Sequence, residues 1–283
     1  MRILEAARRV KSETLRGATW STHVLAKAVI EDSDEGLITC REAERIANII
    51  RSSNRTMAPL WNLASLIVEA CKTGTPPGDT ARRMLWYMED ARQRIYHKAM
   101  DIVTDGSVLL TLSYSSNVEL VLTASNPKMV YVAESLPGGE GVELARHLRT
   151  AGKPVALIPD SAIASSVRES DMVLLGADAV TLDPCLYNKL GSLAAAISAK
   201  WSGKPVVAVF ESYKIHPEAR CGEHYIESRS YRVEGWGDVI YKVFDLVHGS
   251  LVDAMLTEYG ASNFEAGELK SIYARFKEAI LQA

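Results

Sequence analysis

The sequence has few cysteines and no metal-binding pattern. Its four cysteines, Cys40, Cys71, Cys185 and Cys221, are scattered along 283 residues without a Cys-x-x-Cys pair or a Cys/His cluster. Structural zinc sites usually show such closely spaced ligands, so the sequence predicts no metal site. It also has no signal-peptide pattern, and we therefore expect reduced thiols and a cytoplasmic location.

Two phosphate-binding fingerprints are missing as well. No Gly-x-Gly-x-x-Gly follows the first expected strand, and the P-loop pattern does not occur. The first absence argues against a dinucleotide, and the second against P-loop nucleotide binding. No apolar run reaches about 18 residues, the length of a membrane-spanning helix. The sequence therefore predicts no cofactor and no membrane partner.

The charges are unevenly distributed, and the excess of either sign is small. Residues 1–100 contain 16 Lys and Arg against 12 Asp and Glu, whereas residues 101–283 contain 16 against 23. Proteins that bind nucleic acid usually carry a much stronger basic bias. A basic first part and an acidic second part instead suit self-assembly or an anionic ligand.

The first hundred residues have apolar side chains at helical spacing. The break Thr73–Gly78 contains Pro-Pro-Gly and is followed by Asp79, so it should end one helix and start the next. The long last segment suits a helix that connects two domains. We therefore predict a helical N-terminal domain over residues 1–104. The predicted helices are 1–11, 18–31, 40–51, 58–72 and 79–104.

From residue 105 the pattern changes to short apolar runs that alternate with helical segments. Buried parallel strands have this appearance because helices cover both faces of their sheet. We predict a Rossmann-like, doubly wound α/β domain over residues 105–283, with a mainly parallel sheet. The predicted strands are Val108–Leu112, Met129–Ala133, Val155–Ile158, Met172–Leu175, Val206–Phe210 and Tyr241–Phe244. The predicted helices are 115–123, 140–151, 161–168, 188–202, 250–259 and 266–281.

Each predicted strand ends in polar residues. In an open parallel sheet, ligands bind beyond the carboxyl ends of the strands, so these residues should gather along one edge. The residues are Ser113–Ser116, Glu134–Ser135, Asp160–Ser161, Gly176–Asp178, Glu211–Ser212 and Asp245. Some of them, such as Ser115, Asp160 and Ser161, could equally cap the helices that follow.

Asp178 is the strongest candidate for a chemical role. It ends the sequence Gly176-Ala177-Asp178, in which small residues allow other groups to approach closely. A cluster of carboxylates should raise at least one pKa into a range useful for proton transfer.

A phosphate would have to be bound by cationic side chains and helix N-termini. Gly17 and Ala18 offer open backbone N–H groups beside Arg16. A solvated helix face remains the alternative for any single arginine. The candidates are Arg16, Arg51, Arg55 and Lys189, with the Asn188 backbone as a further donor.

Several motifs together resemble a known family. They are Arg-Gly-Ala-Thr (16–19), Val-Tyr-Val-Ala-Glu-Ser-x-Pro (130–137), Asp-Ser-Ala (160–162), Val-Leu-Leu-Gly-Ala-Asp-Ala-Val (173–180), Tyr-Asn-Lys-Leu-Gly (187–191) and the segment 244–260. Their order and spacing resemble the initiation factor 2B alpha/beta/delta family. That family includes methylthioribose-1-phosphate and ribose-1,5-bisphosphate isomerases. The resemblance implies a helical N-terminal domain, a Rossmann-like C-terminal domain, and dimers that can build hexamers.

The resemblance also implies roles for individual residues. The catalytic Asp of the isomerases corresponds to Asp178, and their catalytic Cys corresponds to Ser113. A serine hydroxyl, unlike a thiol, does not ionise usefully near neutral pH without an adjacent base. Leu136 stands where isomerases often have Arg. Positions that contact the sugar phosphate in the isomerases correspond to Arg55, Asn188 and Lys189, and we group with them Arg16, Gly17, Ala18 and Glu134.

Two functions follow from these residues. Ser113 and Leu136 favour a non-catalytic subunit that binds a sugar phosphate or nucleotide as effector, with initiation factor 2 as a partner. Asp178, Asn188 and Lys189 favour the alternative, an aldose–ketose isomerase of a phosphorylated ribose. Cys185 could replace the missing thiol, although a loop cysteine without a role is the simpler interpretation.

Overall fold

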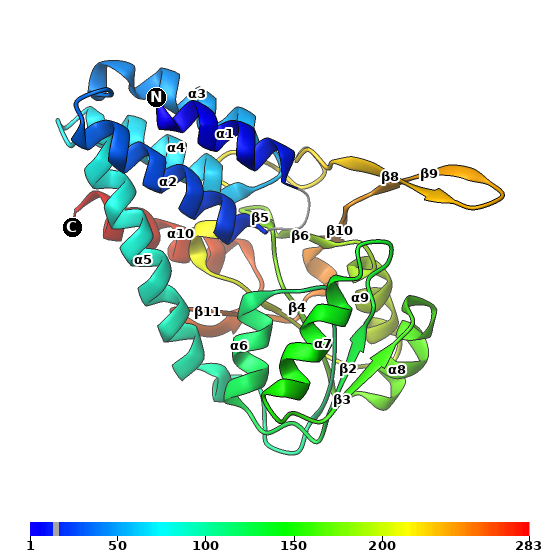
Figure 1. Cartoon of the computed structure of the whole chain (residues 1–283). Coiled ribbons are helices and arrows are strands. Elements are labelled where there is room, and N and C mark those ends of the chain that lie inside the picture. Colours follow the sequence, from blue (N-terminus) through cyan, green and yellow to red (C-terminus); the bar gives the residue numbers. More distant parts are fainter. Residues whose placement is uncertain (14–16, 283) are drawn as a thin grey trace.

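The computed structural model describes residues 1–13 and 17–282, and its first part is helical (Figure 1). The predicted helices over residues 1–104 are present. The last one ends earlier than predicted, at His97, and a separate turn follows it. The elements are α1 (Arg2–Ser12), α2 (Ala18–Asp34), η1 (Cys40–Glu42), α3 (Ala43–Ser53), α4 (Ala58–Cys71), α5 (Pro77–His97) and η2 (Ala99–Asp101).

The helices of the first part enclose a core into which the C-terminal helix also inserts. Leu25, Ile46 and Leu63 are fully buried there. Phe276 and Ile280 of α10 (Ala266–Leu281) belong to the same apolar cluster. Helix α5 runs from this core down to the sheet (Figure 1). The two parts are therefore joined by α5 and α10, and a boundary at residues 104/105 remains a prediction.

The second part is an α/β fold with a mostly parallel sheet of order β12-β11-β7-β4-β1-β2-β3. Only β12 is antiparallel to its neighbour. The sheet strands are β1 (Val108–Leu112), β2 (Met129–Ala133), β3 (Val155–Ile158), β4 (Met172–Leu175), β7 (Val206–Val209), β11 (Ala254–Thr257) and β12 (Gly260–Asn263).

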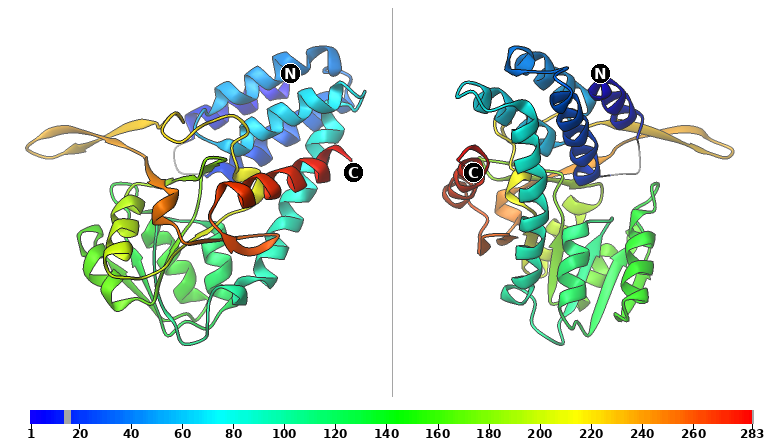
Figure 2. Two further views of the ribbon diagram at one scale, coloured as in Figure 1. Left: turned by 180° about the vertical axis from the view of Figure 1, so that it is seen from behind. Right: turned by 60° about the vertical axis from the view of Figure 1, so that its left-hand side comes forward.

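Helices cover both faces of this sheet, as predicted (Figure 2). One face packs against α5, α6 (Ser116–Ala124) and α7 (Glu140–Thr150). The other packs against α8 (Ile163–Glu169), which follows the turn η3 (Asp160–Ala162), and against α9 (Ser192–Trp201) and α10. The continuous apolar strands are therefore explained by burial on both sides.

The last strand of the parallel set was predicted at the wrong place. Tyr241–Phe244 spans the junction between β9 (Gly237–Lys242) and β10 (Phe244–His248), outside the main sheet. The segment 250–259, predicted as a helix, instead contains η5 (Gly249–Leu251) and β11, which pairs in parallel with β7. A short apolar run fits a buried helix and a buried strand equally well. This segment is a strand because it pairs with the edge of β7.

Two further β-structures were not predicted. β5 (Ala179–Thr181), β6 (Cys185–Lys189) and β10 form a small antiparallel sheet after β4, so the helix predicted from residue 188 begins only at Ser192. β8 (Ser228–Val233) and β9 form a hairpin that projects from the body of the molecule (Figures 1 and 2).

The cysteines are paired, contrary to the expectation of reduced thiols. Disulfides join Cys40 to Cys71 and Cys185 to Cys221, across 31 and 36 residues of sequence. Pairs at such separations leave no local spacing signal, so only the folded chain shows them. Separately, no helix among the described residues combines the length and apolar character that crossing a membrane requires.

Candidate functional site

Hydrogen bonds connect the carboxyl ends of three neighbouring strands. The Ser113 N–H, directly after β1, donates to Ser135 Oγ at 2.7 Å. The Ser135 N–H, after β2, donates to Asp160 Oδ1 at 2.8 Å, after β3. Ser113 and Ser135 both have a φ of 60°. A positive φ is uncommon outside glycine, and residues with this backbone conformation are found most often at functional sites. The predicted edge is thus held together by its own polar groups.

The alternative role of helix capping applies to some edge residues. Ser115 caps α6, because its Oγ accepts a hydrogen bond from the Val118 N–H at 3.4 Å. Asp160 does not cap a helix, since its second oxygen accepts from the Leu136 N–H at 2.7 Å. Its carboxylate therefore stabilises the loop after β2 by accepting hydrogen bonds from the backbone of that loop.

Asp245 was predicted at the end of a main-sheet strand, but it lies in β10 of the small sheet. Its Oδ2 accepts hydrogen bonds from the N–H groups of Gly191 and Leu193 at 2.8 and 3.0 Å. The Asp245 carboxylate therefore takes up these two N–H groups at the start of α9. We expected backbone N–H groups near Asn188 to bind an anion, but these two already donate to Asp245.

Asp178 lies after β4, and the turn into β5 fixes its backbone. Its N–H donates to the carbonyl of Tyr187 at 2.9 Å. Burial raises the pKa of its carboxyl group, whereas the ammonium groups of Lys214 and Lys189 lower it without restoring the ordinary value. Among the described residues, nothing donates a hydrogen bond to this carboxylate. The carboxyl group of Asp178 is therefore buried within the electrostatic influence of two ammonium groups and has no hydrogen-bond donor among the described residues.

Lys189 and Asn188 reach the same region from β6. Lys189 Nζ lies 2.6 Å from Glu140 Oε1, at the start of α7. The other oxygen, Glu140 Oε2, is buried without a hydrogen-bond partner among the described residues. Asn188 is buried, and its Nδ2 donates to Ser192 Oγ at 2.8 Å. A buried carboxylate oxygen without a partner can accept a hydrogen bond from a hydroxyl group.

Gly176 explains why small residues precede Asp178. A Cβ atom at this position would lie 2.6 Å from Ser115 Oγ and 3.4 Å from Asn188 Oδ1. The absence of a side chain therefore lets the ends of β1 and β6 approach β4, as the sequence pattern predicted.

A buried polar cluster follows β7. Glu211 Oε2 lies 3.2 Å from Lys214 Nζ and accepts from Asn117 Nδ2 at 2.5 Å. The Tyr213 hydroxyl donates to Glu211 Oε1 at 2.7 Å. Burial alone would raise the pKa of Glu211, but Lys214 and the two donors hold it below its usual value. Glu211 is thus an anion, and it positions Lys214 toward Asp178.

The first turn of α2 lies beside this cluster. Thr19 hydrogen-bonds the buried side chain of Tyr213. Gly17 is the N-cap of α2 and provides no side-chain cap, and Ala18 is buried. The start of a helix binds anions through its free N–H groups and its dipole. Gly17 and Ala18 therefore lie at a helix start near this cluster and remain candidates for anion binding, whereas Arg16 lies outside the described residues.

Three predicted residues are not joined to Asp178 by a hydrogen bond or ion pair. Arg55 is exposed, and its guanidinium stacks 5.4 Å from the ring of Tyr225. Within residues 1–13 and 17–282, no hydrogen bond or ion pair connects it to the strand ends. Glu134 is half-buried after β2, and its N–H donates to the Ile158 carbonyl at 3.0 Å. Arg51 also points elsewhere, with a hydrogen bond to Ser65 at 3.0 Å.

Sequence reasoning missed Lys214, Glu140 and Asn117. Each follows a strand by only a few residues, on the turn or helix that begins there. The polar residues considered after each strand stopped short of them. Extending the search by one helical turn would have included Asn117 and Lys214.

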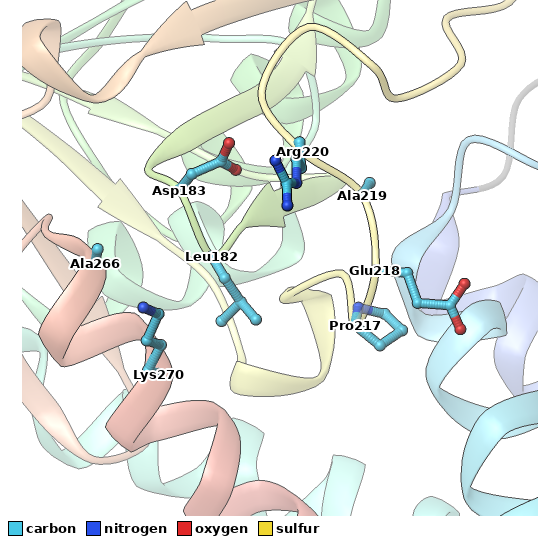
Figure 3. A pocket seen from close by; sticks show the side chains of 8 residues that line it. All are labelled: Leu182, Asp183, Pro217, Glu218, Ala219, Arg220, Ala266 and Lys270. Carbon is cyan, nitrogen blue, oxygen red and sulfur yellow. The ribbon is translucent and has the colours of Figure 1, made fainter.

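A cavity of about 370 Å³ lies away from the strand ends (Figure 3). Asp183 and Arg220 approach one another on neighbouring segments, and Lys270 faces them from α10 (Figure 3). The lining residues are Leu182, Asp183, Pro217, Glu218, Ala219, Arg220, Ala266 and Lys270. None of the predicted site residues lines it, so it is distinct from the region around Asp178.

Comparison with known proteins identifies relatives along nearly the whole chain. An eIF-2B subunit 2-like protein of Pyrococcus abyssi is 31% identical over 271 residues, covering 92% of this chain and 95% of the relative. Ribose 1,5-bisphosphate isomerase of Methanocaldococcus jannaschii is 29% identical over 281 residues, covering 91% and 90%. The crystal structure of a Pyrococcus horikoshii translation initiation factor eIF-2B superimposes with a TM-score of 0.84 at 26% identity, covering 95% and 98%.

These relatives carry two different names and differ little in identity to this chain, so similarity alone does not choose between the functions. It does settle the family. The Initiation factor 2 subunit family matches residues 2–263, and the chain belongs to that family.

Proposed function

We propose that the chain is an initiation-factor-2B-like subunit that binds a sugar phosphate or nucleotide at the strand ends without converting it. The observation that carries the proposal is that two ammonium groups, those of Lys189 and Lys214, act on the buried Asp178 carboxylate, which accepts no hydrogen bond from the described residues. The start of α2 supplies backbone donors for a phosphate beside them. Asp178 and the unpartnered oxygen of Glu140 suit ligand hydroxyl groups.

The absence of catalysis rests on Ser113. Its hydroxyl makes no hydrogen bond with the described residues, so no base activates it. The histidines lie elsewhere. His147 contacts Tyr114, and His216 packs on His224.

The alternative is an isomerase of a phosphorylated ribose. The raised pKa of Asp178 favours it, because a carboxyl group with a raised pKa is better suited to general acid–base proton transfer. An isomerase would still require a second group at the place of Ser113.

Thermal shift with ribose 1,5-bisphosphate, 5-methylthioribose 1-phosphate and AMP tests binding. A ligand at about 100 times its Kd stabilises the folded chain by about 2.7 kcal/mol. We expect Lys189→Ala to abolish the shift. Lys200→Ala, which removes an exposed lysine of α9, is the matched control and should preserve it. Equal shifts in both variants would contradict the proposed site.

NMR detection of ketose formation distinguishes the two functions. We expect no turnover by the natural chain. Turnover that disappears in Asp178→Asn would establish the isomerase instead. Turnover gained by Ser113→Cys would show a pocket that lacks only its thiol.

We also propose that the chain assembles as a dimer or hexamer, contacts initiation factor 2 and acts in the cytoplasm. Static light scattering of the purified chain tests the assembly, and a monomeric mass at micromolar concentration would contradict it.

A further inference from the structure

Three potential metal ligands converge on one side of the small sheet. Cys185 begins β6, Cys221 lies in the loop between η4 (Ser212–Lys214) and β8, and His248 ends β10. The sulfur atoms and one imidazole nitrogen all lie within 4.8 Å of one another. Cys185 is buried, Cys221 half-buried and His248 exposed. The three residues come from separate elements, which is why the sequence showed no spacing motif.

The register of the sheet places two of these ligands. β6 and β10 are antiparallel, and Cys185 pairs directly with His248. Side chains of directly paired residues project from the same face of a sheet. The imidazole and the first sulfur are therefore neighbours because of the ladder itself.

The third ligand is held by separate contacts. The Cys221 N–H donates to both oxygens of Asp183, at 3.0 and 3.1 Å. The next residue, Gly222, donates its N–H to the Tyr187 hydroxyl at 2.8 Å. These bonds would keep the loop beside β6 even if the two sulfurs were not joined.

The imidazole is held in place by Ser250. His248 Nδ1 accepts a hydrogen bond from the Ser250 N–H at 3.2 Å, and Ser250 Oγ lies 3.0 Å from the same nitrogen. To bind a cation through Nε2, the ring moves its proton to Nδ1, where the Ser250 hydroxyl accepts it in place of the backbone bond. Such outer hydrogen bonds orient the ring of a metal-bound histidine and fix its tautomer.

We propose that Cys185, Cys221 and His248 form a binding site for Zn²⁺ or a similar thiophilic cation when both cysteines are reduced. Two thiolates and an imidazole are a donor set that zinc prefers, with water in the fourth position. A tetrahedral zinc ion with ~2.3 Å bonds to sulfur separates two sulfurs by ~3.8 Å. The site therefore needs only small adjustments.

The disulfide and the metal exclude one another. A dithiol reductant transfers two electrons to the Cys185–Cys221 bond, breaks it, and itself becomes a cyclic disulfide. The two thiols formed release two protons as they bind the cation. The site thus has two occupants, a covalent bond under oxidising conditions and a metal ion under reducing conditions, both of which fasten the loop to β6.

The second disulfide provides an internal control. Cys40 and Cys71 lie beside the carbonyl of Thr75, at 3.2 and 3.4 Å. Among the described residues, no His, Asp or Glu completes a group of three ligands there. The proposal therefore predicts metal binding at one pair of cysteines and not at the other.

The test uses the full chain, reduced with a phosphine and freed of metal by a chelator. We expect one Zn²⁺ per chain by equilibrium dialysis, and with Co²⁺ a thiolate-to-metal charge-transfer band. Cys185→Ser and Cys221→Ser should each abolish the band. His248→Ala, at an exposed position, should keep both thiols and weaken Zn²⁺ binding about tenfold or more. The double variant Cys40→Ser/Cys71→Ser should bind like the natural chain.

Three results would overturn the proposal. The first is a reduced natural chain that binds no Zn²⁺. The second is a His248→Ala variant that binds as tightly as the natural chain, which would leave only a thiol pair. The third is loss of binding in the Cys40→Ser/Cys71→Ser variant when circular dichroism shows it to be folded. None of these results depends on the ligand proposed for the strand ends.

Discussion

Asp178 and Glu258 are carboxyl groups at the carboxyl ends of two strands of one sheet, and they have opposite surroundings. Burial raises the pKa of both. Glu258, after β11, accepts hydrogen bonds from the Tyr87 hydroxyl at 2.5 Å, the Ser212 N–H at 3.0 Å and the Ser212 hydroxyl. Asp178 accepts none from the described residues. The comparison teaches that a satisfied buried carboxyl group stabilises the fold, whereas an unsatisfied one is available to a ligand.

The largest expected effect on stability comes from removing Glu258, the carboxyl group whose hydrogen bonds are satisfied. Glu258→Ala removes the shared acceptor of three buried donors and leaves a cavity. The Tyr87 hydroxyl still lies 2.8 Å from Ser212 Oγ and from the Tyr259 hydroxyl, whereas the Ser212 N–H loses its acceptor. We expect the free energy of unfolding, measured by urea denaturation, to fall by about 3 kcal/mol through the lost hydrogen bonds and the cavity together. Glu265→Ala, which removes the N-cap of α10 without a side-chain hydrogen bond, is the control with little effect. A small loss in Glu258→Ala would show that the cluster does not stabilise the fold.

The buried side chain of His216 shows the effect of burial on the pKa of a basic group. His216 Nδ1 accepts from the N–H groups of Glu218 and Ala219 at 3.1 and 2.9 Å. Burial lowers its pKa to about 3, assisted by His224 and Arg51. The unfolded chain therefore binds more protons between pH 6.5 and 3, and the contribution of His216 to stability falls as pH decreases through that range.

Acidification from pH 6.5 to 5 should consequently cost about 2 kcal/mol through this one group. His216→Asn keeps an acceptor but does not titrate, so its stability should decline less steeply over the same range. Parallel pH profiles of the two chains in urea denaturation would show that His216 is not the responsible group.

The smallest expected change in stability concerns Asp178. Its folded pKa is raised, so its contribution to stability is present at low pH and is lost as pH rises through that pKa. Asp178→Asn removes a buried charge without removing a hydrogen bond. We expect the unliganded chain at pH 7 to become slightly more stable, by less than about 1 kcal/mol, while ligand-induced stabilisation disappears. A strong destabilisation would mean that Asp178 resembles Glu258 after all.

The quality of the strand predictions depended on where each strand lies. β1 to β4 were predicted with their observed ends, because their apolar runs are bounded by Gly, Pro or polar residues. β11 was mistaken for a helix, since Leu251, Val252, Met255 and Leu256 also fit helical spacing. Its state was decided by pairing with β7, which local sequence does not encode.

The candidate site was predictable to a similar extent. Ser113, Asp178, Asn188 and Lys189 lie in or beside strands, and the topology brings Asp178 beside the strand that carries Asn188 and Lys189. Arg55 comes from the loop between α3 and α4, and its side chain stacks on Tyr225 instead. Loop geometry and side-chain direction depend on distant neighbours, so spacing could not place it.

The sequence by itself determined the helical first part, the parallel sheet and the polar edge, because periodicity and strand termini are local properties. Only the tertiary structure decided which polar groups are satisfied, which cysteines meet, and which lysines flank Asp178. Those outcomes depend on residues far apart in the chain, such as Cys185 with Cys221 or Glu140 with Lys189, whose proximity exists only after the strands have paired and the helices have packed.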